Sequence, residues 1–551
     1  MREAAAWLRP RRGVAGALLA AILVLALVLR LKGITWGLPY SLINIDETVV
    51  VPKAFAVARG HVNPQFFLYP SFFFYLLGAL DLIAAPVLWL TRDRPPLSLG
   101  TFIVDPGPYY LLGRLLSAAF GTASVYLVYR LGRAAFGLPA GLLAALFLAV
   151  LPLHVAYSHM AVTDVTATAL SLLALVLVFA ATQSGARRWL IAGAAAAGLA
   201  TSTKYNLGML VLPATIGAVY ACRDEAARRV ASGGRAASVW LRLLAARLYA
   251  PMLAAFLIGS PFVVLDAGHF VSDFIKQNRI QGRGWLGYEN VPNGFWYNLT
   301  TNLESTLGIV LLVLVLAGLA WALWRRTTLD VMLAPYVIVY FVYISTWKAL
   351  ADRYLLPLLP LLALLAARLC MDVLRVQGSR RRVLVPVVAG LVAAALYVPL
   401  SASIDFDRGL WGPDARLRAK AWVEANVPAG SVVAAENYGP PLVSAEHDTY
   451  YAGERDLPPT YRLVSLALPG PGVPEPTHDL AWLRGQGAEY VIVSSTVYDR
   501  VLAAPHVYPD IVAFYHDLEA EAELIKTFTP AEGESGPVIK LYLLKGSVPP
   551  A

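Results

Sequence analysis

Two adjacent carboxylates, Asp46 and Glu47, follow directly on the first long apolar stretch of the chain, in the sequence SLINIDET. A carboxylate can act as a general base, or it can help to hold a divalent cation. Neighbouring residues of a helix point about 100° apart, so we expect one of the two to act and the other to support it. Their position also fits a solvated acidic pair at the start of a loop.

A third carboxylate, Asp164, stands in the turn YSHMAVTD. It could orient a substrate hydroxyl or bind a cation. It could equally cap the helix that follows, since Thr166 and Thr168 are also typical of a helix start. His154 and His159 flank this turn. A histidine near a membrane interface is most often just an amphipathic residue, and we retain His159 as a candidate substrate contact.

Three cations stand at the ends of apolar runs. Lys204 lies in LATSTKYNLG, and Lys348 and Arg353 lie in WKALADRYLLP. Arginine grips a phosphate with its fork of N–H donors, and lysine adds a mobile point charge. Long basic side chains at helix ends also reach for lipid headgroups without any further role. Tyr69, in an aromatic run, and Tyr205, beside Lys204, are candidates for further substrate contacts.

The composition of the chain is strongly apolar. Of its 551 residues 58% are hydrophobic and only 15% are charged, with a mean hydropathy of +0.59. Apolar runs of about 20 residues follow one another, which indicates a polytopic α-helical membrane protein with an uncleaved first helix. The net charge of +9 is concentrated near helix ends, so it gives no argument for a nucleic-acid partner.

Several classes of function have no motif to support them. The two cysteines, Cys222 and Cys370, lie beside arginine-rich loops, so we expect unpaired thiols and neither a disulfide framework nor a cysteine metal site. The sequence contains no P-loop, no GxGxxG after a strand, no HExxH and no GxSxG. A nucleotide-driven pump or a soluble-type hydrolase is therefore unsupported.

Clusters of arginine recur between the apolar runs, and the positive-inside bias places them in the cytoplasm. These clusters are Arg9, Arg11 and Arg12; Arg130 and Arg133; Arg187 and Arg188; residues 223–247; Arg325 and Arg326; and residues 375–382. The resulting alternation predicts about 11 spans and a cytoplasmic N-terminus. The predicted spans are residues 14–36, 108–130, 138–157, 165–182, 189–203, 205–221, 247–265, 297–323, 331–347, 354–371 and 383–400.

One further apolar run, residues 66–90, breaks this alternation. It is long enough to span, but a span here would move the following arginine clusters to the outside. Its dense aromatic residues, Pro70, Pro86 and the mid-run Asp81 favour a re-entrant or interfacial segment. The aromatic residues could anchor the chain at the headgroups, or they could line a lipid groove or a sugar-stacking surface.

The last part of the chain has a different pattern. Residues 401–551 contain no spanning run, and the segment that begins near Asp414 reads as an amphipathic helix. SVVAAE, AEYVIVSS and VIKLYLLK read as strands, which predicts a soluble α/β domain after a transmembrane domain of residues 1–400. An odd number of spans places this domain, and all the candidate site residues, on the extracytoplasmic side of the plasma (inner) membrane.

Five segments together resemble the GT-C glycosyltransferases of the protein O-mannosyltransferase and aminoarabinose transferase superfamily. They are DETVVVPKAFAVARGHVNPQFFLYPSFFFYLL, GRLLSAAFGTASVYLVYRLGRAAFG, HVAYSHMAVTD, LATSTKYNLGML and DRYLLPLLPLLALLAA, in that order over about residues 15–400. In the first segment Ser71 stands where the superfamily has a second proline, and Ser158–His159 stand where relatives often have Ser-Arg. The resemblance is to the superfamily and leaves its substrate open.

The resemblance implies a polyprenyl-phosphate-linked sugar as donor and an active site on the extracytoplasmic face. It matches Asp46 to the catalytic base and Asp164 to a second acidic residue. In the mechanism that we expect, Glu47 and Asp164 would orient the sugar or the acceptor. Lys204 and Arg353 match positions that bind the lipid phosphate, while Lys348 is a looser match. It also implies that the loop containing residues 66–90 forms helices at the membrane surface.

We therefore expect an inverting transfer of a monosaccharide to a hydroxyl of a protein, lipid or glycan acceptor. Asp46 would be the general base, and Lys204, Lys348 and Arg353 would stabilise the leaving lipid phosphate. A transporter or flippase of lipid-linked sugars is the alternative, but the candidate charges gather at one surface and no internal repeat is visible. No cofactor is required by the sequence, although the carboxylates would suit Mg²⁺, Mn²⁺ or Ca²⁺.

Overall fold

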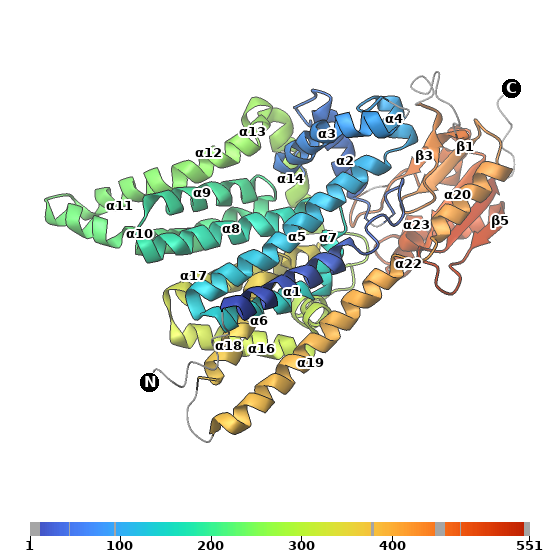
Figure 1. Cartoon of the computed structure of the whole chain (residues 1–551). Helices are drawn as coiled ribbons and strands as arrows, with labels where there is room; N and C mark the ends of the chain where they lie inside the picture. The colour runs from blue at the N-terminus through green and yellow to red at the C-terminus, as the bar shows by residue number, and fades with distance from the viewer. Residues whose placement is uncertain are drawn as a thin grey trace.

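The long apolar stretches fold as helices that lie side by side in one bundle (Figure 1). The computed structural model describes residues 12–42, 44–92, 95–375, 380–446, 458–473 and 475–544, so Arg9 and Arg11 lie outside the described residues. Nine helical segments of this described part are long and apolar enough to cross a membrane. Six of them are single helices: α1 (Arg12–Leu31), α3 (Phe72–Thr91), α5 (Gly107–Phe136), α8 (Thr163–Ser184), α17 (Thr328–Ser345) and α19 (Arg380–Gly409). The other three are made of consecutive helices: Tyr205–Ala231 of η1 (Tyr205–Leu210) and α10 (Val211–Ala231); Ala236–Gly259 of α11 (Ala236–Leu244), η2 (Ala245–Tyr249) and α12 (Ala250–Gly259); and Gly294–Arg325 of α15 (Gly294–Tyr297), η3 (Asn298–Asn302) and α16 (Leu303–Arg325).

Each of the eleven predicted spans falls on a helix, and the chain is a multi-pass membrane protein. The three predicted spans that are not among the nine long segments fold as shorter or broken helices. They are α9 (Arg187–Thr201), α18 (Leu359–Val373), and the pair α6 (Leu138–Ala149) and α7 (Pro152–Ser158), which is bent by 64°. Pro152 is the first residue of α7, and a proline there ends the preceding run of helical hydrogen bonds, which explains the bend.

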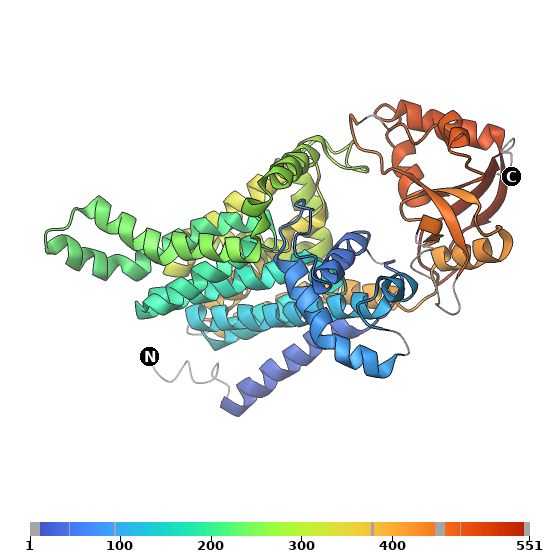
Figure 2. The same cartoon turned by 90° about the horizontal axis from the view of Figure 1, so that it is seen from above.

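The run predicted to be re-entrant or interfacial forms α3, a continuous helix that includes Pro86. With α2 (Glu47–Ala58) and α4 (Leu99–Val104), it lies at the end of the bundle nearest the C-terminal domain (Figures 1 and 2). Its length and composition would also allow it to cross a membrane. Its interfacial placement therefore stays a prediction.

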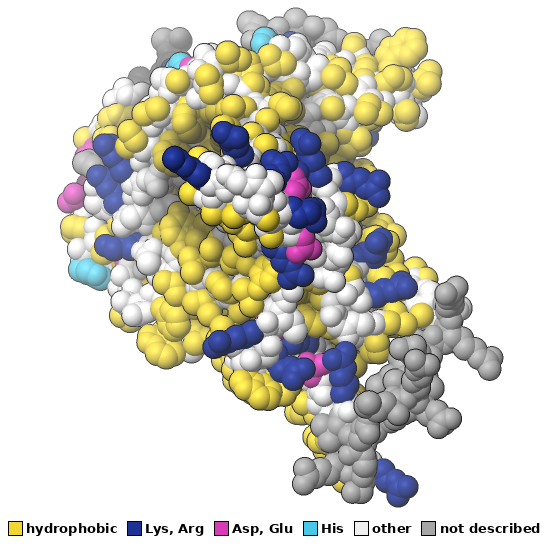
Figure 3. Space-filling model, turned by 90° about the vertical axis from the view of Figure 1, so that its left-hand side faces the viewer, with side chains coloured by type: hydrophobic (Ala, Val, Ile, Leu, Met, Phe, Trp, Pro, Cys, Tyr) yellow, Lys and Arg dark blue, Asp and Glu magenta, His cyan; other side chains and the backbone are white. Residues whose placement is uncertain are grey.

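The two ends of the bundle differ in charge. Lys and Arg side chains gather on the end opposite the C-terminal domain, where Asp and Glu are fewer (Figure 3). The positive-inside bias would place this end in the cytoplasm and the C-terminal domain outside. We call these the basic end and the domain end; their orientation in the membrane stays a prediction.

The C-terminal domain is built on a six-stranded sheet with the order β2-β3-β1-β4-β6-β5. β1 pairs in parallel with β3 and β4, β2 pairs in parallel with β3, and β6 pairs antiparallel with β4 and β5. The strands are β1 (Val432–Glu436), β2 (Val443–Ser444), β3 (Thr460–Leu466), β4 (Tyr490–Ser494), β5 (Ala522–Phe528) and β6 (Ile539–Leu544). The accompanying helices are α20 (Ala415–Asn426), α21 (Leu480–Gly485), α22 (Ser495–Leu502) and α23 (Pro509–Glu521).

The start of this domain is fastened to the first loop at the domain end of the bundle. The predicted boundary at residue 401 falls inside α19, which continues to Gly409. Asp414 caps α20, as the sequence predicts, and also pairs with Arg416. Arg416 donates to the carbonyl of Leu42 at 2.8 Å, and the Trp36 indole donates to the carbonyl of Gly412 at 2.9 Å. These bonds hold the domain beside the loop that carries Asp46.

Candidate active site

Asp46 lies at the start of α2, where its backbone N–H donates to the Asn44 side chain at 2.8 Å. Its carboxylate forms an ion pair with Arg353 of η4 (Asp352–Leu355), although the two residues are 307 positions apart in the chain. The side chains are 19% and 10% exposed, so the pair is shielded but reachable from a cavity. The guanidinium of Arg353 also lies over the Trp285 ring, with 4.9 Å to its centroid.

Asp164 and Lys204 form a second, more buried ion pair. Asp164 belongs to the first turn of α8, and Lys204 immediately precedes η1 after the end of α9. The Lys204 ammonium group lies 4.9 Å from the centroid of the Tyr354 ring, next in sequence to Arg353. The two ion pairs are thus brought together by the segment 352–355.

Two adjoining cavities connect these pairs. The outer cavity, of about 1020 Å³, is lined by Asp46, and the inner cavity, of about 300 Å³, is lined by Asp164 and Lys204. Tyr69 and Arg353 line both cavities. Four predicted residues therefore converge on one site, together with Tyr69 and with Tyr205, which lines the inner cavity.

Cations outnumber carboxylates in the lining of the outer cavity. Helix α14 (Ala267–Arg283) contributes three cations and the C-terminal domain contributes one, Arg500. The C-terminal domain also lines the cavity with the uncharged residues 468–471 and Val473. With Arg353 there are five cations in the lining against two carboxylates. The cations are Lys276, Arg279, Arg283, Arg353 and Arg500, and the carboxylates are Asp46 and Asp352. Such a lining favours an anionic ligand.

The inner cavity has largely aromatic walls. Phe256, Phe270, Phe274 and Trp347 line it with Tyr205, whose ring lies 5.7 Å from that of Phe274. Two hydrogen bonds to the backbone of Phe67 fix the loop that carries Tyr69 beside these walls. The backbone N–H of Phe67 donates to Asp273 at 2.7 Å, and the Tyr205 hydroxyl donates to the Phe67 carbonyl at 3.1 Å. Burial raises the pKa of Tyr69 well above its usual value, so it faces the site as a neutral phenol.

Glu47 does not join this site, and its predicted catalytic role is wrong for a simple geometric reason. Its carboxylate is fully buried against Arg114 of α5, whose two nitrogens donate to it at 3.0 and 2.8 Å. It also accepts from the Ala161 backbone N–H at 2.7 Å and from the Ser41 hydroxyl at 2.8 Å. All its lone pairs are directed into the protein, so Glu47 fastens the first loop to α5.

His159 is likewise directed away from the two cavities. Its ring is buried and its nitrogens lie 2.9 Å from the Val155 carbonyl and 3.0 Å from the Lys32 carbonyl. The nearest carboxylate is that of Asp407 on α19, at 3.7 Å. The predicted substrate contact of His159 is therefore not supported, because its ring packs against the α1–α19 side of the turn.

Lys348 also lies outside the site. Its exposed side chain lines a separate cavity of about 630 Å³, between the loop of residues 284–293 and the C-terminal domain. Trp285 and Tyr288 line both this cavity and the outer cavity, whereas Lys348 lines only this one. Lys348 is thus near the site but does not face the two ion pairs.

Asp352 is a site residue that the sequence did not single out. It lines the outer cavity, and its carboxylate accepts from the Tyr157 hydroxyl at 3.1 Å. Burial raises the pKa of Asp352 above its usual value, with the nearby Asp164 adding in the same direction. Its place beside Arg353, in a turn predicted to lie on the extracytoplasmic face, was the signal that the sequence offered.

The groups around the two carboxylates bear on the divalent cation that the sequence left open. The described part of the chain has no group of three or more His, Cys, Asp and Glu side chains suited to a metal. Asp46 and Asp164 are each neutralised by a protein cation instead. Each of these two carboxylates thus already has a cationic partner within the protein.

Comparisons with known proteins agree with this architecture. Residues 110–260 match the model of the dolichyl-phosphate-mannose-protein mannosyltransferase family. The chain has no significant match among curated proteins. Among solved structures, the apo oligosaccharyltransferase of Archaeoglobus fulgidus superposes with a TM-score of 0.58 at 12% identity, over 92% of this chain and 72% of that one.

Two further solved structures contain a lipid phosphate. ArnT from Cupriavidus metallidurans bound to undecaprenyl phosphate has a TM-score of 0.53 at 15% identity, over 98% of this chain and 100% of that one. The A. fulgidus oligosaccharyltransferase AglB, with an inhibitory peptide and a dolichol-phosphate, has a TM-score of 0.51 at 12% identity, over 95% and 74%. The chain therefore has the fold of these structures, which is the GT-C fold that the resemblance found in the sequence implied.

Proposed function

We propose that this protein transfers a monosaccharide from a polyprenyl-phosphate donor to an acceptor hydroxyl at the domain end of the bundle, outside the cytoplasm. The observation that carries the proposal is the meeting of two carboxylate–cation pairs, Asp46–Arg353 and Asp164–Lys204, across adjoining cavities. Such a site offers a base and a phosphate-binding cation within one polar pocket. The fold it shares with ArnT and AglB, whose structures hold undecaprenyl phosphate and dolichol-phosphate, supports the same donor class.

The inner cavity suits the lipid end of the donor. Its aromatic walls would hold the first isoprene units, and Lys204 and Arg353 would face the phosphate. In the free protein each cation is neutralised by a carboxylate. A donor phosphate would compete with Asp46 for Arg353 and so release the Asp46 carboxylate for the acceptor.

The reaction would be a direct displacement. The acceptor oxygen forms a bond to the anomeric carbon while its proton passes to Asp46, and the bond from that carbon to the phosphate oxygen breaks. The electron pair leaves on the polyprenyl phosphate, whose growing charge Lys204 and Arg353 stabilise. Attack opposite the leaving group inverts the anomeric centre. Asp164 would hold Lys204 in place, and Tyr69 would contact the sugar.

The outer cavity suits the acceptor. It opens between α14 and the C-terminal domain, whose residues 468–471, Val473 and Arg500 form part of its wall. An acceptor held here would be contacted by both domains. This arrangement supports a role of the C-terminal domain in the choice among protein, lipid and glycan acceptors.

The test is a single-turnover assay of the full chain with a radiolabelled polyprenyl-phosphate sugar. The wild type should release polyprenyl phosphate only when an acceptor is present. Asp46→Asn should abolish this release without weakening donor binding, because Arg353 is left free for the phosphate. Asp405→Asn is the matched control, since Asp405 is an exposed carboxylate of α19.

Wild-type turnover by the Asp46→Asn variant would refute the assignment of the base. Donor binding without any cleavage by the wild type, together with movement of the donor across a vesicle membrane, would instead identify a flippase. Addition of a chelator to the same assay tests the divalent cation that the sequence left open.

A further inference from the structure

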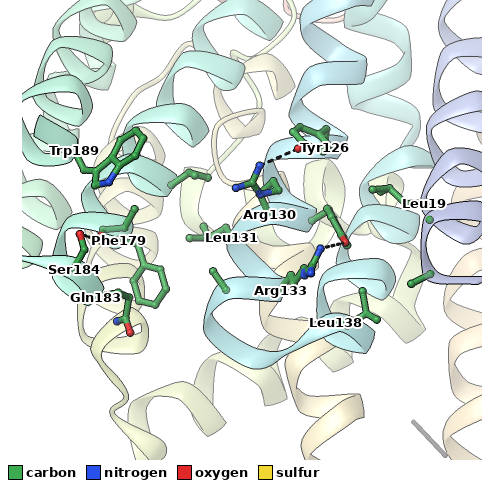
Figure 4. A pocket seen from close by; sticks show the side chains of 16 residues that line it. Leu19, Tyr126, Arg130, Leu131, Arg133, Leu138, Phe179, Gln183, Ser184 and Trp189 are labelled. Atoms are coloured by element: carbon green, nitrogen blue, oxygen red, sulfur yellow. Dashed lines mark hydrogen bonds between the residues drawn. The ribbon is translucent and has the colours of Figure 1, made fainter. Parts of the chain in front are cut away.

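A large cavity at the basic end of the bundle belongs to no part of the proposed site. It has a volume of about 980 Å³ and lies between α1, α5, α8 and the start of α9 (Figure 4). Its described lining residues include none of those that line the outer or inner cavity. Any ligand of this cavity is therefore distinct from a substrate bound at the domain end.

Two arginines of α5 supply the charge of this cavity. Arg130 donates to the Tyr126 hydroxyl at 2.9 Å and Arg133 donates to the Tyr129 hydroxyl at 3.0 Å, each partner being four residues earlier on the helix (Figure 4). Each bond uses one of the five N–H donors of a guanidinium and leaves the others available. The tyrosines thus hold both arginines in place without neutralising them.

No carboxylate balances these charges in the described part of the chain. The lining residues include no Asp or Glu, and neither Arg130 nor Arg133 forms an ion pair with a described residue. The other arginine-rich segments at this end differ in this respect. Arg229 and Arg247, for example, both pair with Glu225. The cavity therefore presents two fixed positive charges that lack an anion.

The rest of the lining is mainly apolar. Leu19 of α1, Leu131 of α5 and Phe179 of α8 lie on its walls, and Trp189 stands at its edge at the start of α9 (Figure 4). The neighbouring face of α1 exposes large apolar side chains, among them Leu18, so it faces lipid. The cavity thus combines a charged end with an apolar wall that continues onto a lipid-facing surface.

We propose that this cavity binds an anionic phospholipid, with its phosphate on Arg130 and Arg133 and an acyl chain against Leu19 and Phe179. Basic pockets between helices at the membrane–water interface are suited to phosphate headgroups, and tryptophan is favoured at that interface. A soluble phosphate would use the arginines but would gain nothing from the apolar wall. The combination of charge and apolar surface therefore favours a lipid.

Native mass spectrometry of the detergent-purified full chain tests this proposal, with phosphatidylglycerol and phosphatidylcholine as probes. The wild type should retain phosphatidylglycerol in preference to phosphatidylcholine. The double variant Arg130→Gln/Arg133→Gln should bind phosphatidylglycerol roughly 30-fold more weakly, since it removes two cations near the headgroup. The variant Arg325→Gln/Arg326→Gln removes the same charge outside the cavity and should bind like the wild type.

A second variant changes the cavity without changing its charge. Gly16 of α1 lines the cavity, and a Cβ placed there meets no atom within 4 Å, so Gly16→Phe should fold and fill the space. It should weaken phosphatidylglycerol binding while leaving the arginines in place. Equal losses in both arginine variants, or wild-type binding by Gly16→Phe, would overturn the proposal. Full displacement of the lipid by millimolar inorganic phosphate would also overturn it, in favour of a soluble-anion site.

Discussion

The buried ion pair between Glu47 and Arg114 gives the sharpest test of how the first loop is held. Both side chains are fully buried, and the Glu47 carboxylate accepts four hydrogen bonds, two of them from Arg114. Glu47→Gln keeps the shape of the side chain but leaves the Arg114 charge without a partner. Breaking a buried pair in this way costs about 3–5 kcal/mol, because the remaining charge stays buried and uncompensated.

The loss of stability is measured by heating the purified protein and monitoring the fraction that stays folded by size-exclusion chromatography. The exposed pair of Asp405 and Arg408, with side chains 67% and 72% exposed, supplies the matched control, and Asp405→Asn should cost about 0–1 kcal/mol. The double variant Glu47→Gln/Arg114→Met removes the stranded charge and should be more stable than Glu47→Gln alone. The reasoning fails if Glu47→Gln unfolds at the wild-type temperature, or if the double variant shows no recovery.

Three further outcomes are expected at the candidate site. Burial raises the pKa of the Asp352 carboxyl, so this group binds a proton more tightly in the folded protein than in the unfolded chain. Its contribution to folding stability is therefore lost as the pH rises from the pKa of the unfolded chain to the raised pKa of the folded protein. Asp352→Asn should therefore be more stable than the wild type at neutral pH, and melting curves should converge below about pH 4. Lys204→Met should lower kcat by roughly 10²-fold in the transfer assay, since one cation is lost from the leaving phosphate; an unchanged kcat would remove Lys204 from the site. Chelation with EDTA should leave transfer unchanged, because Lys204 and Arg353 would supply the positive charge that the leaving phosphate needs; loss of activity that Mg²⁺ restores would contradict this.

The helices could be predicted from the sequence because membrane spans need long apolar runs, and such runs are visible without any knowledge of packing. The strands β3 and β5 of the C-terminal domain were not predicted, since exposed positions interrupt the apolar pattern of each strand. Strands β1, β4 and β6 were predicted correctly because they are mostly buried and read as apolar runs.

Part of the candidate site could be predicted because the apolar runs also show which charged residues lie at helix ends. Charge placement relative to the apolar runs, with the superfamily resemblance, brought Asp46, Asp164, Lys204 and Arg353 to one end, and the structure joins them in two ion pairs. Glu47 could not be separated from Asp46, because adjacent carboxylates look alike until their partners are known. The partner of Glu47 lies 67 residues away on α5, and nothing in the sequence marks that contact.

The pairing of opposite charges explains how so polar a site can be built at the end of an apolar bundle. An unpaired carboxylate or ammonium group in this position would be costly to bury, so each charge needs a partner while the site is empty. A donor phosphate would add negative charge to a set of cations that already exceeds the carboxylates of the outer cavity. The carboxylate displaced from Arg353 is then free to accept the proton of an acceptor hydroxyl. Binding of the donor and activation of the base would in this way be a single electrostatic event.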